Sequence, residues 1–364
     1  MTIKKPLIIG VGGVGRLLAV MLSELGMKVT GMDAVQRDIP KGVKFVKGDV
    51  LHHEELAKIF VGHDAIISCL PYHLTLTVAK AAGQAGNHYF DPTEDVETTR
   101  QIRQLAETSH GVMIPQCGLA PGFIGIAGAY IANQFDEGNL RHIRLRVGAL
   151  PQHPIGQLGY AGNWSLAGLV HEYIAECDII EGGKALKVPA LRLNEILRID
   201  GIEYEAFTTS GGLGTMTETY LGKTEELNYK SIRYPGHLAG MKLLIEEMRF
   251  KNDEAALVER IANALPPDDQ DRVLVHASVQ GEIKGKMQTK ELVGDYKPME
   301  IGGKTRTAIA WTTAASIAAV VEMVSEKTLP QSGFVKQEEI PLPAFLKTKF
   351  GALYAEDHPM LCKE

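Results

Sequence analysis

A glycine-rich segment near the start of the chain has the residue types and the spacing needed to hold a phosphate group. Gly10, Gly12 and Gly15 follow the pattern GxGxxG, with Gly13 and Val14 between the last two. In this pattern the first glycine permits a tight turn, the second lets a ligand approach the backbone, and the third lets a helix pack closely on a strand. Amides at the start of that helix would then face the phosphate. The pattern predicts a dinucleotide-binding loop, and a glycine turn without function is the alternative interpretation.

An acidic residue at the end of the next predicted strand supports the binding interpretation. Asp33 lies 18 residues after Gly15. A carboxylate in this place accepts hydrogen bonds from ribose hydroxyls and repels a 2′-phosphate. The sequence therefore predicts NAD as the cofactor. NADP stays an alternative because Arg37 is close enough in sequence to pair with a 2′-phosphate, although a plain surface charge also explains Arg37.

Further residues follow predicted strands, so they are expected at the carboxyl edge of a parallel sheet, where ligands of such folds bind. These residues are Asp49, Cys69, Leu70, Pro71, Asp91, Cys117 and Gly118. We expect Asp49 near the adenine, although a solvated turn aspartate fits the sequence equally well. The others are expected near the nicotinamide, with Asp91 as a candidate catalytic base. Cys117 is interpreted as a small packing residue rather than a nucleophile.

The first third of the chain alternates short apolar runs with helical patterns, which is typical of βαβ units on a parallel sheet. Strands are predicted at 7–9, 28–32, 43–46, 65–69, 89–90 and 112–115. Helices are predicted between the first two strands and at 54–60, 74–85 and 96–108. Residues 1–122 are therefore expected to form a doubly wound α/β domain of the Rossmann dinucleotide-binding type.

The rhythm changes after Gly122, where longer alternating strands appear. Strands are predicted at 141–150, 185–207 and 272–293, and helices at 166–175, 236–249 and 304–325. This pattern predicts a second, α+β domain over residues 123–329 with a mostly antiparallel sheet, for substrate binding and oligomerisation. The tail at 330–364 could fold back on the first domain.

Several polar and aromatic residues of the second half could bind and position a small substrate. They are Trp164, Ser165, Glu172, Arg233, Tyr234 and His237. The planar guanidinium of Arg233 suits a carboxylate, and a histidine such as His237 can accept a proton near neutral pH. The alternatives are a structural ion pair for Arg233, a satisfied helix-start histidine for His237, a core position for Trp164 and a solvated position for Glu172.

Four motifs give the chain a specific resemblance. They are CGLAPG at 117–122, NWS followed by LVHEY at 163–173, EAFTTSGG at 205–212 and RYPGH at 233–237. With these motifs, the sequence from residue 6 to about residue 325 resembles the saccharopine dehydrogenase-like family, and within it most closely the L-lysine 6-dehydrogenases. The tail beyond Pro330 matches poorly.

The resemblance implies a fold, an assembly and a reaction. It implies a Rossmann domain joined to an α/β substrate domain, usually in homo-oligomers, and here we expect a homodimer. The implied chemistry is NAD(P)-linked oxidation of an amino-acid C–N bond, best exemplified by conversion of L-lysine to 2-aminoadipate 6-semialdehyde and ammonia. Arg233 would hold the α-carboxylate, and His237 or Asp91 would act as base. Two alternatives stay open, a saccharopine or carboxypolyamine-type secondary-amine reaction and a non-catalytic NAD(P)-binding regulator.

Composition excludes other classes of protein. The 364 residues include 38 Lys and Arg against 44 Asp and Glu, so the net charge of −6 gives no overall electrostatic attraction for nucleic acid. The four cysteines form no CxxC pair, so we expect reduced thiols, no metal site and a cytoplasmic protein. The apolar segment at 307–324 reads as a buried helix rather than a membrane span.

Overall fold

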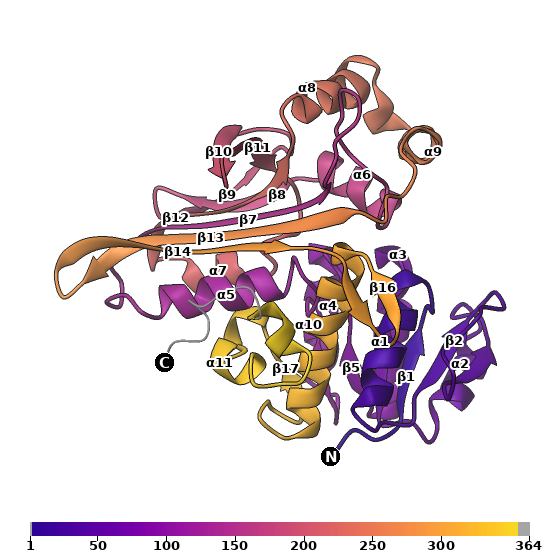
Figure 1. Cartoon of the computed structure of the whole chain (residues 1–364). Helices are drawn as coiled ribbons and strands as arrows, with labels where there is room; N and C mark the ends of the chain where they lie inside the picture. Colours follow the sequence, from indigo (N-terminus) through magenta and orange to yellow (C-terminus); the bar gives the residue numbers. More distant parts are fainter. Residues whose placement is uncertain (1, 356–364) are drawn as a thin grey trace. The chain divides into compact units, whose positions relative to one another are not determined.

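The computed structural model describes residues 2–355, so Cys362 lies outside the described residues. The chain divides into two compact units, and each is described here by itself (Figure 1). The first unit contains the described residues up to Ile126 and those from Ala310 onward. The second unit contains Ala127–Ile309. The second unit is therefore an insertion within the first.

The first unit is built on a parallel sheet in the order β17-β6-β5-β4-β1-β2-β3. The strands are β1 (Pro6–Ile9), β2 (Thr30–Asp33), β3 (Lys44–Lys47), β4 (Ala65–Ser68), β5 (His88–Phe90), β6 (Val112–Ile114) and β17 (Gly333–Phe334). The sequence predicts the first six of these strands. Because β1 lies between β2 and β4, the strand order reverses beside β1, which is where doubly wound sheets bind dinucleotides.

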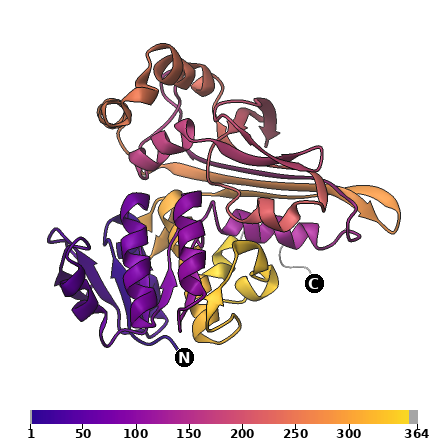
Figure 2. The same ribbon diagram turned by 180° about the vertical axis from the view of Figure 1, so that it is seen from behind.

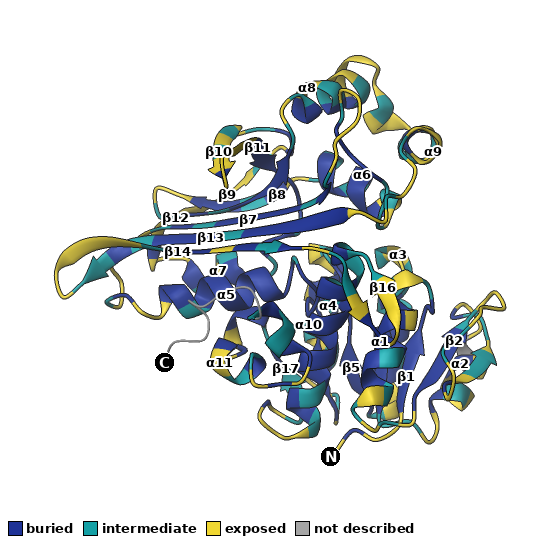
Figure 3. Ribbon diagram, in the orientation of Figure 1, coloured by how far each residue is buried: buried dark blue, intermediate teal, exposed yellow. Residues whose placement is uncertain are grey.

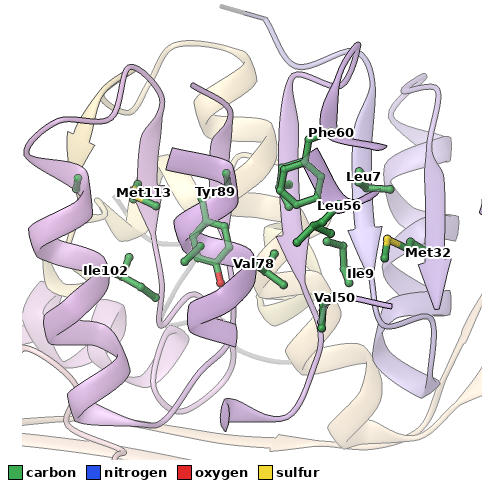
Figure 4. Packing of buried hydrophobic residues seen from close by; sticks show 14 residues of the cluster. Leu7, Ile9, Met32, Val50, Leu56, Phe60, Val78, Tyr89, Ile102 and Met113 are labelled. Carbon is green, nitrogen blue, oxygen red and sulfur yellow. The ribbon is translucent and has the colours of Figure 1, made fainter. Parts of the chain in front are cut away.

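Helices cover both faces of this sheet. They are α1 (Gly13–Glu24), α2 (His53–Phe60), α3 (Tyr72–Ala85), α4 (Val96–Ala106) and α10 (Ala308–Ser325), with the short α11 (Leu342–Phe345), η3 (Gln337–Glu339) and η4 (Gly351–Tyr354). Helices α2, α3 and α4 pack on one face through a buried apolar cluster that includes Phe60, Val78, Tyr89 and Ile102 (Figure 4). Helices α1 and α10 lie on the opposite face (Figures 1 and 2).

The end of the chain completes the first unit, which corrects the predicted boundary at residue 329. Helix α10 is predicted as part of the second domain, but from Ala310 onward it belongs to the first unit. Its last residue, Ser325, accepts a hydrogen bond from the amide of Ile3 (3.1 Å), next to β1. Further on, β17 adds a parallel strand beside β6. Helix α10 is long and apolar enough to span a membrane by length and composition alone, but most of it is buried inside the protein.

The second unit contains an eight-stranded mixed sheet with the main order β10-β11-β12-β7-β13-β14. Its strands are β7 (Leu140–Pro151), β8 (Cys177–Glu181), β9 (Lys184–Val188), β10 (Glu195–Ile199), β11 (Ile202–Thr208), β12 (Thr224–Arg233), β13 (Asp271–Ile283) and β14 (Lys286–Tyr296). A separate hairpin pairs β15 (Met299–Ile301) with β16 (Lys304–Arg306). Only the β12–β7 pairing is parallel in the eight-stranded sheet, in agreement with the predicted mostly antiparallel sheet. The predicted strand at 185–207 is divided into β9, β10 and β11, and that at 272–293 into β13 and β14. Strands β8 and β12 are not predicted.

The helices of the second unit pack in two groups. They are α5 (Phe123–Ala132, which begins in the first unit), α6 (Leu166–Ile174), α7 (Met216–Tyr220), α8 (His237–Lys242), the π-helix η1 (Leu243–Glu247), η2 (Phe250–Asn252) and α9 (Glu254–Ala264). Helix α5 is buried almost throughout (Figure 3), and a side chain at Gly128 would collide with Leu145 of β7. Helices α6, α8 and α9 share a second core with Phe207 of β11.

Candidate functional site

The glycine loop has the conformation and the free space that a phosphate group requires. Gly10 has a φ of +88°, and an added Cβ would lie 2.8 Å from the carbonyl oxygen of Cys69. At Gly15 an added Cβ would overlap the carbonyl oxygen of Gly10. By contrast, a Cβ at Gly12 or Gly13 would meet nothing within 4 Å. No side chain caps the start of α1, where Val14 follows Gly13, so its first amides are available to an anion.

Asp33 ends β2 and is held as a hydrogen-bond acceptor beside this loop. Its Oδ2 accepts from the amide of Val11 (3.2 Å), and its Oδ1 accepts from the amide of Val35 (3.0 Å). Arg37 Nε lies 3.5 Å from Oδ2, although the Arg37 side chain is 48% exposed. Each carboxylate oxygen can accept more than one hydrogen bond, so Asp33 can still receive ribose hydroxyls. The residues around the loop therefore fit a dinucleotide.

The other predicted cofactor residues lie at strand ends, in turns and at the start of a helix. Pro71 is the N-cap residue of α3, with Leu70 before it and Cys69 following β4. The Asp49 carboxylate accepts from the amide of Leu51 (3.0 Å), as a turn aspartate does. Gly118 is packed so closely that an added Cβ would lie 2.8 Å from Pro92. These residues shape the carboxyl edge of the sheet, and their contact with a cofactor stays a prediction.

Asp91 follows β5 and is completely buried. Its Oδ1 accepts from the amide of Thr93 (2.7 Å), but its Oδ2 has no hydrogen-bond partner within residues 2–355. Burial raises the pKa of this carboxyl to about 7. The neighbouring Cys117 thiol donates to the Asp91 carbonyl (3.2 Å), and burial raises the pKa of that thiol well above its ordinary value. Cys117 is thus a packed thiol, without the lowered pKa that marks a nucleophile.

Arg233 ends β12 and carries its charge into the core of the second unit. The side chain is 3% exposed. Its Nε donates to the Tyr173 hydroxyl (2.8 Å) and its Nη1 to the carbonyl of Ile232 (2.8 Å), and the guanidinium lies 4.9 Å from the centre of the Tyr160 ring. Among residues 2–355 it forms no ion pair, and the charge of Glu172 is one of the causes that raise its pKa. This arrangement does not support the structural ion-pair interpretation of Arg233.

His237 is linked to Arg233 through Tyr173. The Tyr173 hydroxyl lies 3.0 Å from His237 Nε2, and His237 Nδ1 lies 2.8 Å from the carbonyl oxygen of Leu158. Because a carbonyl only accepts, the geometry assigns the proton to Nδ1, and Nε2 then accepts from Tyr173. Burial, with the Arg233 charge as a second cause, lowers the pKa of His237 to about 3. His237 therefore has no free nitrogen with which to act as a base, and the geometry favours a positioning role.

The remaining predicted substrate residues have different structural positions. Trp164 Nε1 donates to the Tyr160 hydroxyl (2.6 Å), so Trp164 is connected through Tyr160 to the residues around Arg233. Ser165 caps α6 by accepting from the amide of Gly168 (3.1 Å). Glu172 is buried, which contradicts a solvated position.

Tyr234 lies in another group of residues. Its ring centroid is 5.4 Å from that of Tyr204, and its hydroxyl donates to the carbonyl of Pro151 (2.8 Å). Tyr234 therefore packs in a different core from Arg233, because adjacent strand residues point to opposite faces.

Sequence reasoning missed the aromatic residues that hold the cluster together. Tyr160 and Tyr173 contact Arg233 from two sides, and Tyr173 also contacts His237. The available signal was the position of Tyr173 at the end of LVHEY, three residues after a helical apolar position.

Comparisons with known proteins agree across nearly the whole chain. The family model described as "Saccharopine dehydrogenase NADP binding domain" matches residues 7–113, and that described as "Saccharopine dehydrogenase C-terminal domain" matches residues 118–355. Apo saccharopine dehydrogenase (L-Glu forming) from Saccharomyces cerevisiae is similar in structure, with a TM-score of 0.75 and 17% identity over 96% of this chain and 98% of that one.

Two further solved structures align over the length of the chain with lower similarity. An engineered D-amino acid dehydrogenase bound to NADP+ has a TM-score of 0.46 and 14% identity, covering 98% of this chain and 100% of that one. DAP dehydrogenase from C. glutamicum in complex with DAP has a TM-score of 0.48 and 12% identity at the same coverage.

Proposed function

The chain belongs to the saccharopine dehydrogenase family, and we propose that it is an NAD-dependent dehydrogenase that oxidises the ε-amine carbon of free L-lysine. The products would be 2-aminoadipate 6-semialdehyde and ammonia. The family and the fold establish an NAD(P)-dependent oxidoreductase. The substrate, the C–N bond and the preference for NAD are our proposal.

The observation that carries the proposal is the buried, unpaired charge of Arg233. An isolated buried charge is costly, and proteins usually compensate it with a partner or a ligand. Two aromatic rings and one hydroxyl hold the guanidinium in place, and no carboxylate within residues 2–355 pairs with it. The α-carboxylate of an amino acid is a matching ligand, because a planar guanidinium can bind a carboxylate through two parallel hydrogen bonds.

The other arginines considered for substrate binding favour a substrate with a single carboxylate. Saccharopine carries further carboxylates and would need a second free cation. The candidate arginines already have partners: Arg144 pairs with Glu226, Arg146 with Glu195 and Arg192 with Glu246. This pattern supports lysine over saccharopine.

Each part of the chain then has a defined task. Arg233 binds the α-carboxylate, while Tyr173 and His237 fix the orientation of its guanidinium. The glycine loop and Asp33 bind the pyrophosphate and the ribose of NAD. When bound, the nicotinamide accepts a hydride from the carbon that bears the amine. The reaction balances as lysine with a protonated ε-amine plus NAD+ plus water giving semialdehyde, ammonium, NADH and one proton.

A substrate screen tests the proposal. We expect NAD+ reduction with L-lysine, ammonia formed one-for-one with NADH, and no reaction with cadaverine, which lacks the α-carboxylate. The rate should rise above neutral pH because an unprotonated amine is needed and a lysine ε-amine titrates near about 10.4. Activity with saccharopine but not with lysine would make saccharopine the substrate instead of lysine. Cofactor binding without any turnover would indicate a regulator.

We also propose a cytoplasmic homodimer. Its basis is the cysteine usage of the sequence and the usual assembly of the family. Light scattering of the purified protein tests the assembly.

A further inference from the structure

Two buried polar atoms that have no hydrogen-bond partner within residues 2–355 lie at the carboxyl ends of neighbouring strands in the first unit. One is the acceptor Oδ2 of Asp91, just after β5, and the other is the donor Nε2 of Gln116, two residues after β6. Asp91 is 0% exposed and Gln116 is 2% exposed. The strands pair in parallel, with Phe90 opposite Ile114, so both residues leave the sheet at the same edge.

The Tyr89 hydroxyl and the Gln116 backbone also lie near the Asp91 carboxyl and act to lower its pKa, but within residues 2–355 no group makes a hydrogen bond to Asp91 Oδ2 or to Gln116 Nε2. The Cys117 amide donates to the Asp91 carbonyl (3.0 Å), which keeps the two segments hydrogen-bonded beyond the strands. Gln116 has a φ of +60°, an uncommon and strained conformation for a residue other than glycine. Native proteins leave few buried polar atoms unpaired, so an acceptor and a donor together require an explanation.

The nicotinamide ring carries a group with the complementary pair of functions. Its carboxamide has N–H donors and a carbonyl acceptor, and dinucleotide folds bind their ligand outside the carboxyl ends of the strands. Resting on the proposed cofactor, we propose that Asp91 and Gln116 form a carboxamide clamp, in which Asp91 Oδ2 accepts from the amide nitrogen and Gln116 Nε2 donates to the amide oxygen. This makes Asp91 a hydrogen-bond acceptor for the cofactor rather than the catalytic base.

The charge of Asp91 adds a second consequence. Burial raises the pKa of its carboxyl to about 7, with Glu94 acting in the same direction and Thr93, Tyr89 and Gln116 acting against it. Asp91 is therefore more ionised at pH 8.5 than at neutral pH. A carboxylate beside the ring attracts the positively charged nicotinamide of NAD+ more than the neutral ring of NADH. The clamp should therefore favour the oxidised cofactor at alkaline pH.

The test is cofactor binding at pH 8.5 without an amine substrate, measured by calorimetry on the whole protein. The probes are NAD+, its 3-acetylpyridine analogue, which keeps the carbonyl but lacks the N–H donors, and ADP-ribose, which lacks the ring. The variants are Asp91→Ala, Asp91→Asn and Gln116→Met. Asn87→Ala is the matched control, because Asn87 also has an unpartnered buried oxygen but precedes β5 at the opposite end of the strand.

We expect Asp91→Ala to weaken NAD+ binding about tenfold and to weaken the analogue clearly less, because both positively charged rings lose the attraction of the carboxylate but only NAD+ loses a hydrogen bond. Gln116→Met should weaken NAD+ and the analogue equally. Asp91→Asn should retain an acceptor but lose the preference for NAD+ over NADH. Asn87→Ala should leave the ratio of NAD+ to analogue affinity unchanged, and ADP-ribose should bind all variants alike.

Several results would overturn the clamp. Unchanged NAD+ binding in Asp91→Ala and Gln116→Met would mean that the two atoms bind only water. Normal NAD+ binding with lost turnover in Asp91→Ala would make Asp91 the base. A loss that extends to ADP-ribose in Asp91→Asn would indicate general damage to the unit. If the wild-type protein bound neither NAD+ nor ADP-ribose, the proposed cofactor itself would fail.

Discussion

The two units differ in which buried polar groups lack a partner: one has unpaired hydrogen-bonding atoms and the other an uncompensated charge. In the first unit, the Asp91 Oδ2 and Gln116 Nε2 atoms each lack a hydrogen-bond partner within residues 2–355. In the second, Arg233, Tyr173 and His237 form a continuous hydrogen-bond chain, but the guanidinium has no counter-ion within residues 2–355. The first region is complementary to an amide, and the second is complementary to an anion. A buried side chain can therefore have its hydrogen bonds satisfied while its charge stays uncompensated.

The largest expected effect comes from removing the unpaired charge. Arg233→Met should raise the KM for L-lysine by at least about 100-fold, because a buried charge that binds an anion contributes roughly 3 kcal/mol or more. The Kd for NAD+ should stay unchanged. Steady-state kinetics, calorimetry and thermal melts on the same variant provide the measurement.

Arg192→Met is the matched control for this variant. Arg192 already pairs with Glu246 at 2.6 Å, and its side chain is 42% exposed, so its loss should change KM little. If Arg233→Met lowered the melting temperature and weakened both ligands together, Arg233 would be a structural residue.

In the first unit, the glycine loop should be sensitive to a single methyl group. Gly12→Ala should fold normally, since its Cβ would meet no protein atom within 4 Å, yet the methyl group would occupy space that the pyrophosphate needs. We expect the Kd for NAD+ to rise at least about tenfold, the scale of one lost charge-assisted hydrogen bond. Gly83→Ala, whose Cβ would have an ordinary contact at 3.7 Å, is the control. Normal NAD+ binding by Gly12→Ala would argue against phosphate binding at this loop.

Asp33 should set the choice between the two cofactors. Asp33→Ser removes an acceptor for the ribose and a charge that repels a 2′-phosphate, so NAD+ binding should weaken by about 1–3 kcal/mol while relative use of NADP+ improves. Competition of the two cofactors in the lysine assay measures this ratio. A wild-type preference for NADP+ that disappears in Arg37→Ala would reverse the interpretation.

The smallest expected effects are opposite pH dependences of stability in the two regions. The folded pKa of Asp91 is raised from 3.8 to about 7, so its stabilising contribution falls as pH rises through that window. The folded pKa of His237 is lowered from 6.5 to about 3, so its contribution falls as pH drops through that window. The melting temperature of Asp91→Asn, relative to wild type, should rise as pH increases from 4 to 7. The melting temperature of His237→Asn, relative to wild type, should rise as pH decreases below 6.5. Parallel curves would contradict the burial argument.

Local patterns in the sequence predicted the first unit well. The GxGxxG loop, Asp33 and the alternating apolar runs depend on neighbours close in the chain, which single-sequence periodicity can detect. Strand β17 and the assignment of α10 to the first unit were not predicted, because both depend on contacts between residues more than 200 positions apart in the sequence. In the second unit, RYPGH indicated Arg233 and His237. The contact of Tyr173 with both residues, and the lack of an ion pair at Arg233 among residues 2–355, depend on how α6 and β12 lie in the folded unit.

The insertion of the second unit within the first also dictates an order of events during synthesis. Residues 127–309 are continuous, so every strand and helix that lies wholly in the second unit is synthesised before the last part of the first unit. The first unit is complete only with the last described residues. Gln337 accepts a hydrogen bond from the amide of Gly122 (2.6 Å), and the Tyr354 ring stacks on the Phe123 ring with their centroids 3.8 Å apart. A nascent chain therefore carries an unfinished parallel sheet through most of its translation. A ribosome stalled shortly before residue 337 would hold a chain with the whole second unit and an incomplete nucleotide-binding unit.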